Sequence, residues 1–192
     1  MVTIVRIKTL AIEVIAVTLT WVLFYRLSLW MFSYFEYSPH VYWVFLPAGI
    51  RMIAVFIFGW AGVLGLFIGH AITNHTETTS QIVYWATISS LSPMLAKWVC
   101  MRWYNIPSAL QGLSGKQLLV FSVAGALANA LFSSLHFYSS GVSENLNDFI
   151  PTFVGDLLGM MIMLYLCRAL IKLAIALHNP RARVDLHEKI VY

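Results

Sequence analysis

The sequence predicts an all-α fold: a polytopic membrane helix bundle of about six transmembrane helices, with both termini in the cytoplasm. Hydrophobic residues occupy 60% of the 192 positions and charged residues only 10%, whereas about a quarter of a typical soluble domain is charged. Apolar runs near the ~20 residues that a helix needs to cross a bilayer recur along the chain. The few charged residues are sorted by sign between alternate connections, a pattern typical of membrane proteins.

The first three predicted spans lie in the N-terminal half of the chain. Two basic residues precede an apolar run at 9–31 that lacks a small-residue cleavage site, so we expect a retained helix rather than a signal peptide. Spans at 41–58 and 60–74 are separated only by Gly59, which predicts a tight hairpin. The third span is short and glycine-rich, so a tilted or partly re-entrant segment is the alternative for it.

Three further spans complete the predicted bundle. They are expected at 81–103, 117–139 and 149–175, where apolar runs are bounded by polar segments. The six spans form one predicted transmembrane domain, 1–178, and residues 179–192 form a short, polar cytoplasmic tail.

The connections between these spans differ in charge. The segments SYFEYSPH, TNHTETTS and GVSENLND contain four acidic residues and no lysine or arginine. Basic residues gather on the opposite side: Arg6, Lys8, Lys97, Arg102, Lys116, Arg168, Lys172, Arg181, Arg183 and Lys189. Because basic residues collect at cytoplasmic ends, both termini are expected in the cytoplasm, which requires an even number of spans. This topology accounts for the excess of basic residues, so we expect no nucleic-acid partner.

Two charged residues are predicted to lie deep in the membrane. Arg51 is about ten residues, or ~15 Å, from the outer surface, and Asp156 is about seven residues, or ~10 Å, below it. An isolated ionised side chain at the bilayer centre costs about 2.5–3.5 kcal/mol on insertion scales, and arginine cannot lose its proton to avoid this cost. We therefore expect Arg51 to pair with Asp156, and Glu13, which lies nearer the cytoplasmic face, is the alternative partner.

Other polar residues map to the same outer half of the predicted bundle. They include His70, Ser89, Asn129 and His136, which together predict a polar cavity open to the outside. The alternative is that serine and asparagine form hydrogen bonds between helices and that the histidines lie among lipid headgroups. No catalytic or metal-binding motif with the required spacing is present in the sequence, so we expect no enzymatic activity, no cofactor and no metal site.

Two segments resemble a known family. LPAGIRMIAVFIFGWAGVLGLFIG (46–69) and FVGDLLGMMIMLYL (153–166) resemble the bacterial integral membrane sensory domain called MASE1. The residues that carry the resemblance are Pro47, Gly49, Gly59, Gly69, Gly155, Asp156 and Gly159. Arg51 departs from the apolar residue expected at its position.

This resemblance implies a multi-helix sensory module in the bacterial cytoplasmic (inner) membrane. Such modules are usually fused to a diguanylate cyclase, histidine kinase or phosphodiesterase. Because this sequence ends at Tyr192 without an output domain, we expect a stand-alone module that signals through a separate membrane or cytoplasmic protein.

The leading hypothesis is accordingly a multi-pass sensory or small-ligand-binding subunit. A small anionic ligand is expected to compete with Asp156 for Arg51 through charge-assisted hydrogen bonds. One alternative is a substrate-binding subunit of a transporter. The other is a ligand-free accessory subunit of a larger membrane complex, in which the Arg51–Asp156 pair only holds helices together.

Overall fold

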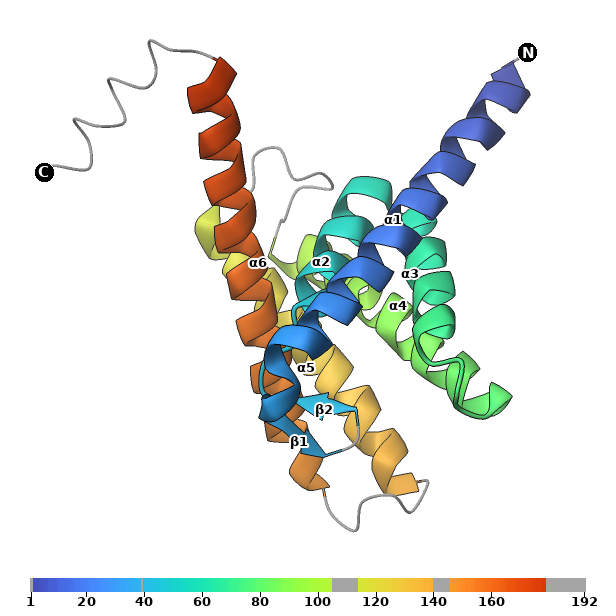
Figure 1. Cartoon of the computed structure of the whole chain (residues 1–192), viewed down its shortest axis with the longest axis vertical. Coiled ribbons are helices and arrows are strands. Elements are labelled where there is room, and N and C mark those ends of the chain that lie inside the picture. The colour runs from blue at the N-terminus through green and yellow to red at the C-terminus, as the bar shows by residue number, and fades with distance from the viewer. Residues whose placement is uncertain (1, 39, 105–113, 140–145, 179–192) are drawn as a thin grey trace, which may run out of the picture.

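The computed structural model describes residues 2–38, 40–104, 114–139 and 146–178. These residues form six α-helices, two short 3-10 helices and one two-stranded sheet (Figure 1). In chain order the elements are α1 (Val2–Phe32), η1 (Ser33–Phe35), β1 (Glu36–Ser38), β2 (Val41–Tyr42), α2 (Pro47–Phe58), α3 (Trp60–Thr73), α4 (Thr79–Trp103), α5 (Gly115–Ser139), η2 (Leu146–Asp148) and α6 (Phe149–His178). The all-α prediction is confirmed for this part of the chain. The predicted tail, 179–192, lies outside the described residues.

The expected span at 41–58 begins later than predicted. Val41 and Tyr42 belong to β2, which pairs antiparallel with β1, and α2 starts only at Pro47. Proline suits the first turn of a helix because its ring fixes φ near the helical value and no N–H is needed there. The turn between the strands includes His40, whose φ of 69° is a left-handed conformation that histidine adopts more readily than most residues.

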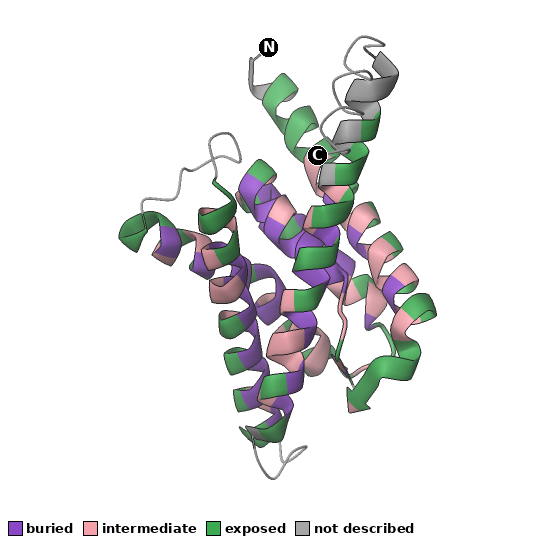
Figure 2. Cartoon of the chain, turned by 90° about the vertical axis from the view of Figure 1, so that its left-hand side faces the viewer, coloured by how far each residue is buried: buried purple, intermediate pink, exposed green. Residues whose placement is uncertain are grey.

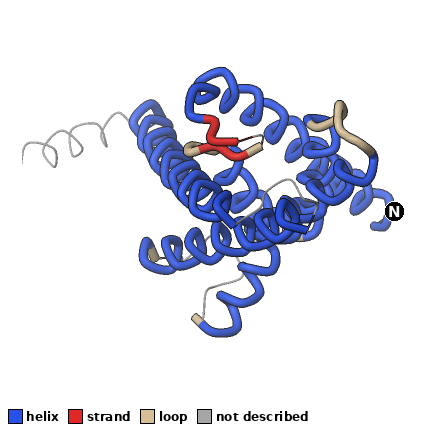
Figure 3. Tube along the Cα trace, turned by 90° about the horizontal axis from the view of Figure 1, so that it is seen from below, coloured by secondary structure: helices blue, strands red, loops and turns tan. Residues whose placement is uncertain are grey.

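The helices alternate in direction along the molecule (Figure 1). The hairpin β1–β2 lies at one end together with the α3–α4 loop (74–78), and we call this the hairpin end. The start of α1 and the end of α6 lie at the opposite end. Seen from the hairpin end, the strands lie beside α1 and α6 (Figure 3), and the Ser38 hydroxyl donates a hydrogen bond of 2.8 Å to Asp148, just before α6.

Helix α2 occupies the centre of the bundle. Nine of its twelve residues are buried. Ala48, Met52 and Phe56 pack with residues of α4, α5 and α6, while Ile50 and Val55 pack with residues of α1 and α3. Figure 2 shows this buried interior, whereas residues 5–12 of α1 are exposed.

The helices differ in whether they can cross a bilayer. Three helical stretches of the described residues are long and apolar enough to do so: Val5–Phe35, Gly115–Ser139 and Phe149–Cys167. Helices α2 and α3 have only 12 and 14 residues, or ~18 and ~21 Å at the rise of an α-helix, which is less than the ~30 Å of a hydrocarbon core. Helix α4 has 25 residues but is more polar, with serines at 89, 90 and 92.

Glycines let the segment before α2 lie directly on α6. A Cβ on Gly155 would overlap the carbonyl oxygen of Tyr42, and a Cβ on Gly159 would overlap that of Phe45. The Phe45 N–H donates a hydrogen bond of 3.1 Å to the Gly155 carbonyl. Gly59, with a φ of 55°, forms the turn between α2 and α3 that the sequence predicts.

We expect Gly159→Ala to lower the stability of the protein. The added methyl group has no space against Phe45, and overpacking of this kind costs about 1–3 kcal/mol. Gly125→Ala is the matched control, because a Cβ there meets only the end of Met160 at 3.6 Å and alanine favours a helix. Thermal unfolding in lipid nanodiscs should show a lower midpoint for Gly159→Ala alone. Equal midpoints for the two variants would contradict this account.

Candidate functional site

A buried ion pair joins the central helix to α6. Arg51 Nη2 donates a hydrogen bond of 2.5 Å to Asp156 Oδ1, and the two side chains are only 5% and 3% exposed. Asn129 Nδ2, on α5, donates a hydrogen bond of 2.8 Å to the other carboxylate oxygen. The Phe45 ring lies 5.5 Å from the Arg51 guanidinium carbon. The pairing of Arg51 with Asp156, rather than with Glu13, is therefore present in the structure.

Both partners retain unused hydrogen-bonding capacity. A guanidinium carries five N–H groups, and Arg51 donates one hydrogen bond within the described part of the chain. An ionised carboxylate has about four acceptor positions, and Asp156 accepts two hydrogen bonds from described residues.

A cavity of about 70 Å³ lies against this pair. All six helices contribute side chains to it. In four cases the lining residues recur at helical spacing: His70 on α3 with Asn74 at its C-cap, Trp85, Ile88 and Ser89 on α4, Asn129, Ser133 and Phe137 on α5, and Thr152 and Asp156 on α6. Residues three or four positions apart lie on one face of a helix. Each of these helices therefore presents a single face to the cavity, and together these faces carry both polar and apolar side chains. Arg51 of α2 and Tyr25 of α1 also line it, and the remaining lining residues come from the segment between α1 and α2: His40, Val41, Tyr42 and Phe45.

The predicted cavity residues are placed as follows. His70, Ser89 and Asn129 line the cavity. His136 is not among the lining residues, because it is offset by one position from Phe137 and its ring instead stacks on Tyr84 at 3.7 Å.

Several lining residues were not predicted. Asn74, Ser133 and Thr152 each lie four positions from a residue that the sequence singled out, so helical periodicity carries enough information to find them. Tyr25 and Phe45 could not be singled out in this way. Aromatic residues are 15% of the chain, and nothing in the sequence distinguishes these two from the others.

Two buried polar atoms at the cavity have no hydrogen-bond partner among the described residues. They are His70 Nδ1 and Ser89 Oγ, and both residues line the cavity. Buried polar atoms are normally paired with protein groups or ordered water. A cavity of this volume holds about five water molecules, at ~10–15 Å³ each, so the two atoms are positioned to bind water or a polar ligand.

A second unpaired serine lies on the other side of Arg51. Ser92 Oγ has no partner within the part of the chain that the structure describes, and it lines a small cavity of about 10 Å³ together with Arg51 and Pro93. Pro93 lies inside α4, and since proline has no N–H, the carbonyl of Ser89 lacks its helical donor. Polar groups of α4 therefore flank Arg51 on two sides.

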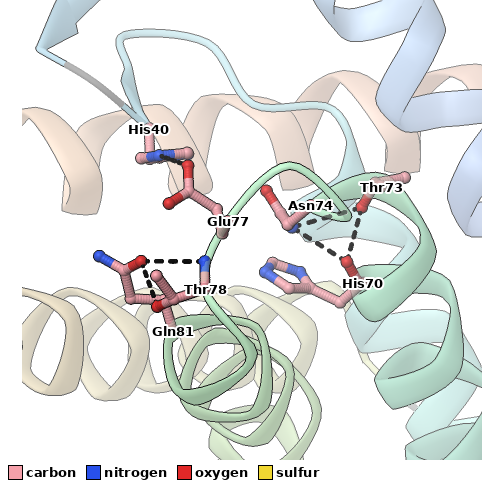
Figure 4. Close-up of polar contacts among 7 residues, drawn as sticks. All are labelled: His40, His70, Thr73, Asn74, Glu77, Thr78 and Gln81. Carbon is pink, nitrogen blue, oxygen red and sulfur yellow. Dashed lines mark hydrogen bonds and ion pairs between the residues drawn. The ribbon is translucent and has the colours of Figure 1, made fainter.

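The cavity approaches the surface at the hairpin end. His40, whose side chain is 37% exposed, lines the cavity and lies 3.2 Å from the Glu77 carboxylate in the α3–α4 loop. Figure 4 shows this pair beside the His70 ring, with Asn74 donating a hydrogen bond to the His70 carbonyl. Thr78 and Gln81 form a capping box that fixes the start of α4. The pair thus connects the hairpin to the α3–α4 loop at the mouth of the cavity.

The described residues offer no group of three or more histidine, cysteine, aspartate or glutamate side chains that could hold a metal ion. Searches against protein-family models, curated proteins and solved structures give no match to this chain. The residues that resemble MASE1 have packing roles here: Pro47 begins α2, Gly49 faces Met163, and Gly69 faces Trp21.

We expect removal of either charge of the pair to destabilise the fold more than removal of both. Breaking a buried pair costs about 3–5 kcal/mol because the remaining charge is unpaired, whereas apolar replacement of both partners is often neutral. Arg51→Met and Asp156→Leu should each lower the unfolding midpoint, and the double variant should recover most of the loss. Additive losses in the double variant would show that the pair is not the source of the stability.

Proposed function

We propose that this protein is a membrane-embedded sensory or ligand-binding subunit whose small ligand occupies the cavity beside Arg51 and Asp156. The observation that carries the proposal is the buried ion pair that lines a cavity of mixed polar and apolar character. Charged side chains inside a membrane are costly and are usually functional. The unpaired atoms of His70 and Ser89 at the same cavity support a ligand site over a purely structural pair.

The proposed topology has six membrane-embedded helices and two cytoplasmic termini, in the bacterial inner membrane. Acidic residues at the hairpin end and basic residues at the opposite end support this orientation. Helices α2 and α3 are too short to cross alone, but they form a hairpin packed against the longer helices, and α2 is mostly buried. Protein rather than lipid therefore surrounds most of α2.

The ligand is proposed to carry an anionic group that Arg51 recognises. Charge-assisted hydrogen bonds to a guanidinium are among the stronger polar contacts available to a protein. An anionic group that takes N–H groups of Arg51 weakens its bond to Asp156, and this bond connects α2 to α6. Ligand binding would thus change how the central helix packs on α6, which continues to His178 at the cytoplasmic end.

A separate protein is proposed to receive this change, in line with the resemblance to MASE1. The N-terminal turns of α1 and the later turns of α6 expose apolar side chains such as Val5, Ile7, Tyr165 and Leu170. These surfaces face lipid or a partner. Purification from native membranes followed by mass spectrometry of proteins and small molecules identifies which partner is present.

Cysteine labelling tests the orientation. In a Cys100→Ala/Cys167→Ala background, we expect Thr76→Cys to react with a membrane-impermeant thiol reagent in intact cells. Lys116→Cys should react only after permeabilisation, because it lies in the first turn of α5, on the side of the basic residues. The opposite labelling pattern would reverse the topology and place the cavity mouth in the cytoplasm.

Ligand binding is tested with small anions. Acetate, glycolate and inorganic phosphate are titrated into the protein in nanodiscs, and binding is measured by calorimetry. We expect at least one of them to bind, and we expect Arg51→Met to weaken that binding at least tenfold because it removes the guanidinium donors. Glu13→Gln, a charge removal away from the cavity lining, is the control that should bind normally. Equal binding by Arg51→Met and the unmodified protein would show that Arg51 does not contribute to the binding site.

A further inference from the structure

The ion pair presents both a cation and an anion to one cavity. Arg51 and Asp156 both line it, and they are the only lysine, arginine, aspartate or glutamate residues among its described lining residues. Counting only the described residues as partners, four N–H groups of Arg51 and about two acceptor positions of Asp156 are left for a third molecule. The site therefore offers donors and acceptors that are fully charged and lie side by side.

The net charge of the site discriminates between ligand classes. The paired residues carry opposite charges, so a ligand with only a negative charge would leave one uncompensated charge in a buried, poorly solvated place. Such burial is strongly unfavourable. A ligand with one negative and one positive group adds no net charge, and each of its groups meets a residue of opposite sign.

We propose that the ligand is a small zwitterion of the α-amino-acid type. Its carboxylate accepts hydrogen bonds from Arg51, and its ammonium group donates to Asp156. This inference rests on the proposed function, because it specifies what accompanies the anionic group that Arg51 recognises. It also gives a role in binding to the Asp156 carboxylate, which lines the cavity beside Arg51.

The neighbouring polar atoms fit such a ligand. Ser89 Oγ and His70 Nδ1 are buried without partners among the described residues, and a molecule with several donors and acceptors can pair with both. The cavity volume of about 70 Å³ corresponds to about five to seven water-sized positions. A volume of this size accommodates a small amino acid such as glycine or alanine.

The test compares four small probes, of which glycine and glycolate are closely matched in size. Glycine carries both charges, glycolate replaces the ammonium group with a hydroxyl, acetate lacks it, and methylammonium carries only the positive group. Calorimetric titration into the full chain in nanodiscs should show glycine binding at least tenfold more tightly than the other three. Asp156→Asn should reduce the affinity for glycine to the level of glycolate, and Glu13→Gln should leave it unchanged.

The possible results separate this inference from the proposed function. Glycolate or acetate binding as tightly as glycine overturns the zwitterion while leaving an anion site at Arg51. The absence of binding by every probe in this panel and by phosphate overturns both. Because the comparison among probes uses the unmodified protein, it decides the question even if Asp156→Asn does not fold.

Discussion

The structure depends on one electrostatic constraint: a guanidinium that cannot lose its charge lies at the centre of an apolar bundle. Arg51 is on the most buried helix, so its counter-charge must be brought to it by other elements. Asp156 on α6 supplies that charge, and Asn129 on α5 holds the second carboxylate oxygen. Side chains of α2, α5 and α6 thereby meet at one point, and the packing of these helices must bring them within hydrogen-bonding distance.

Close backbone packing on one side makes this meeting of helices possible. Gly155 and Gly159 flank Asp156 in sequence and bring α6 against the segment that leads into α2. A larger residue at either position would push the carboxylate away from Arg51. The other side of the pair is packed differently, because α3 and α4 face it across a cavity with unpaired polar atoms. The site is therefore closely packed where the charges are held and open where we propose that the ligand binds.

Much of this arrangement could be predicted from the sequence, because alternating helices fix the depth of each residue along the bundle axis. Apolar runs located all six helices, and sorted charges gave the relative depth from which the pairing of Arg51 with Asp156 follows. The hairpin β1–β2 was missed because its two strands are three and two residues long, too short for a periodic signal. His136 was misplaced because depth alone does not say which face of α5 a residue occupies.

Helix α2 is both the centre of the hydrophobic core and the bearer of Arg51, and this has an evolutionary consequence. Under the proposed function, a substitution on α2 that alters ligand binding also disturbs packing against its neighbours, so folding and binding do not vary independently there. The side chains of His70 on α3 and Ser89 on α4 line the cavity and belong to neither hydrophobic core cluster. Divergence in what related proteins recognise should accumulate on these two helices, while α2 and the glycine face of α6 change little.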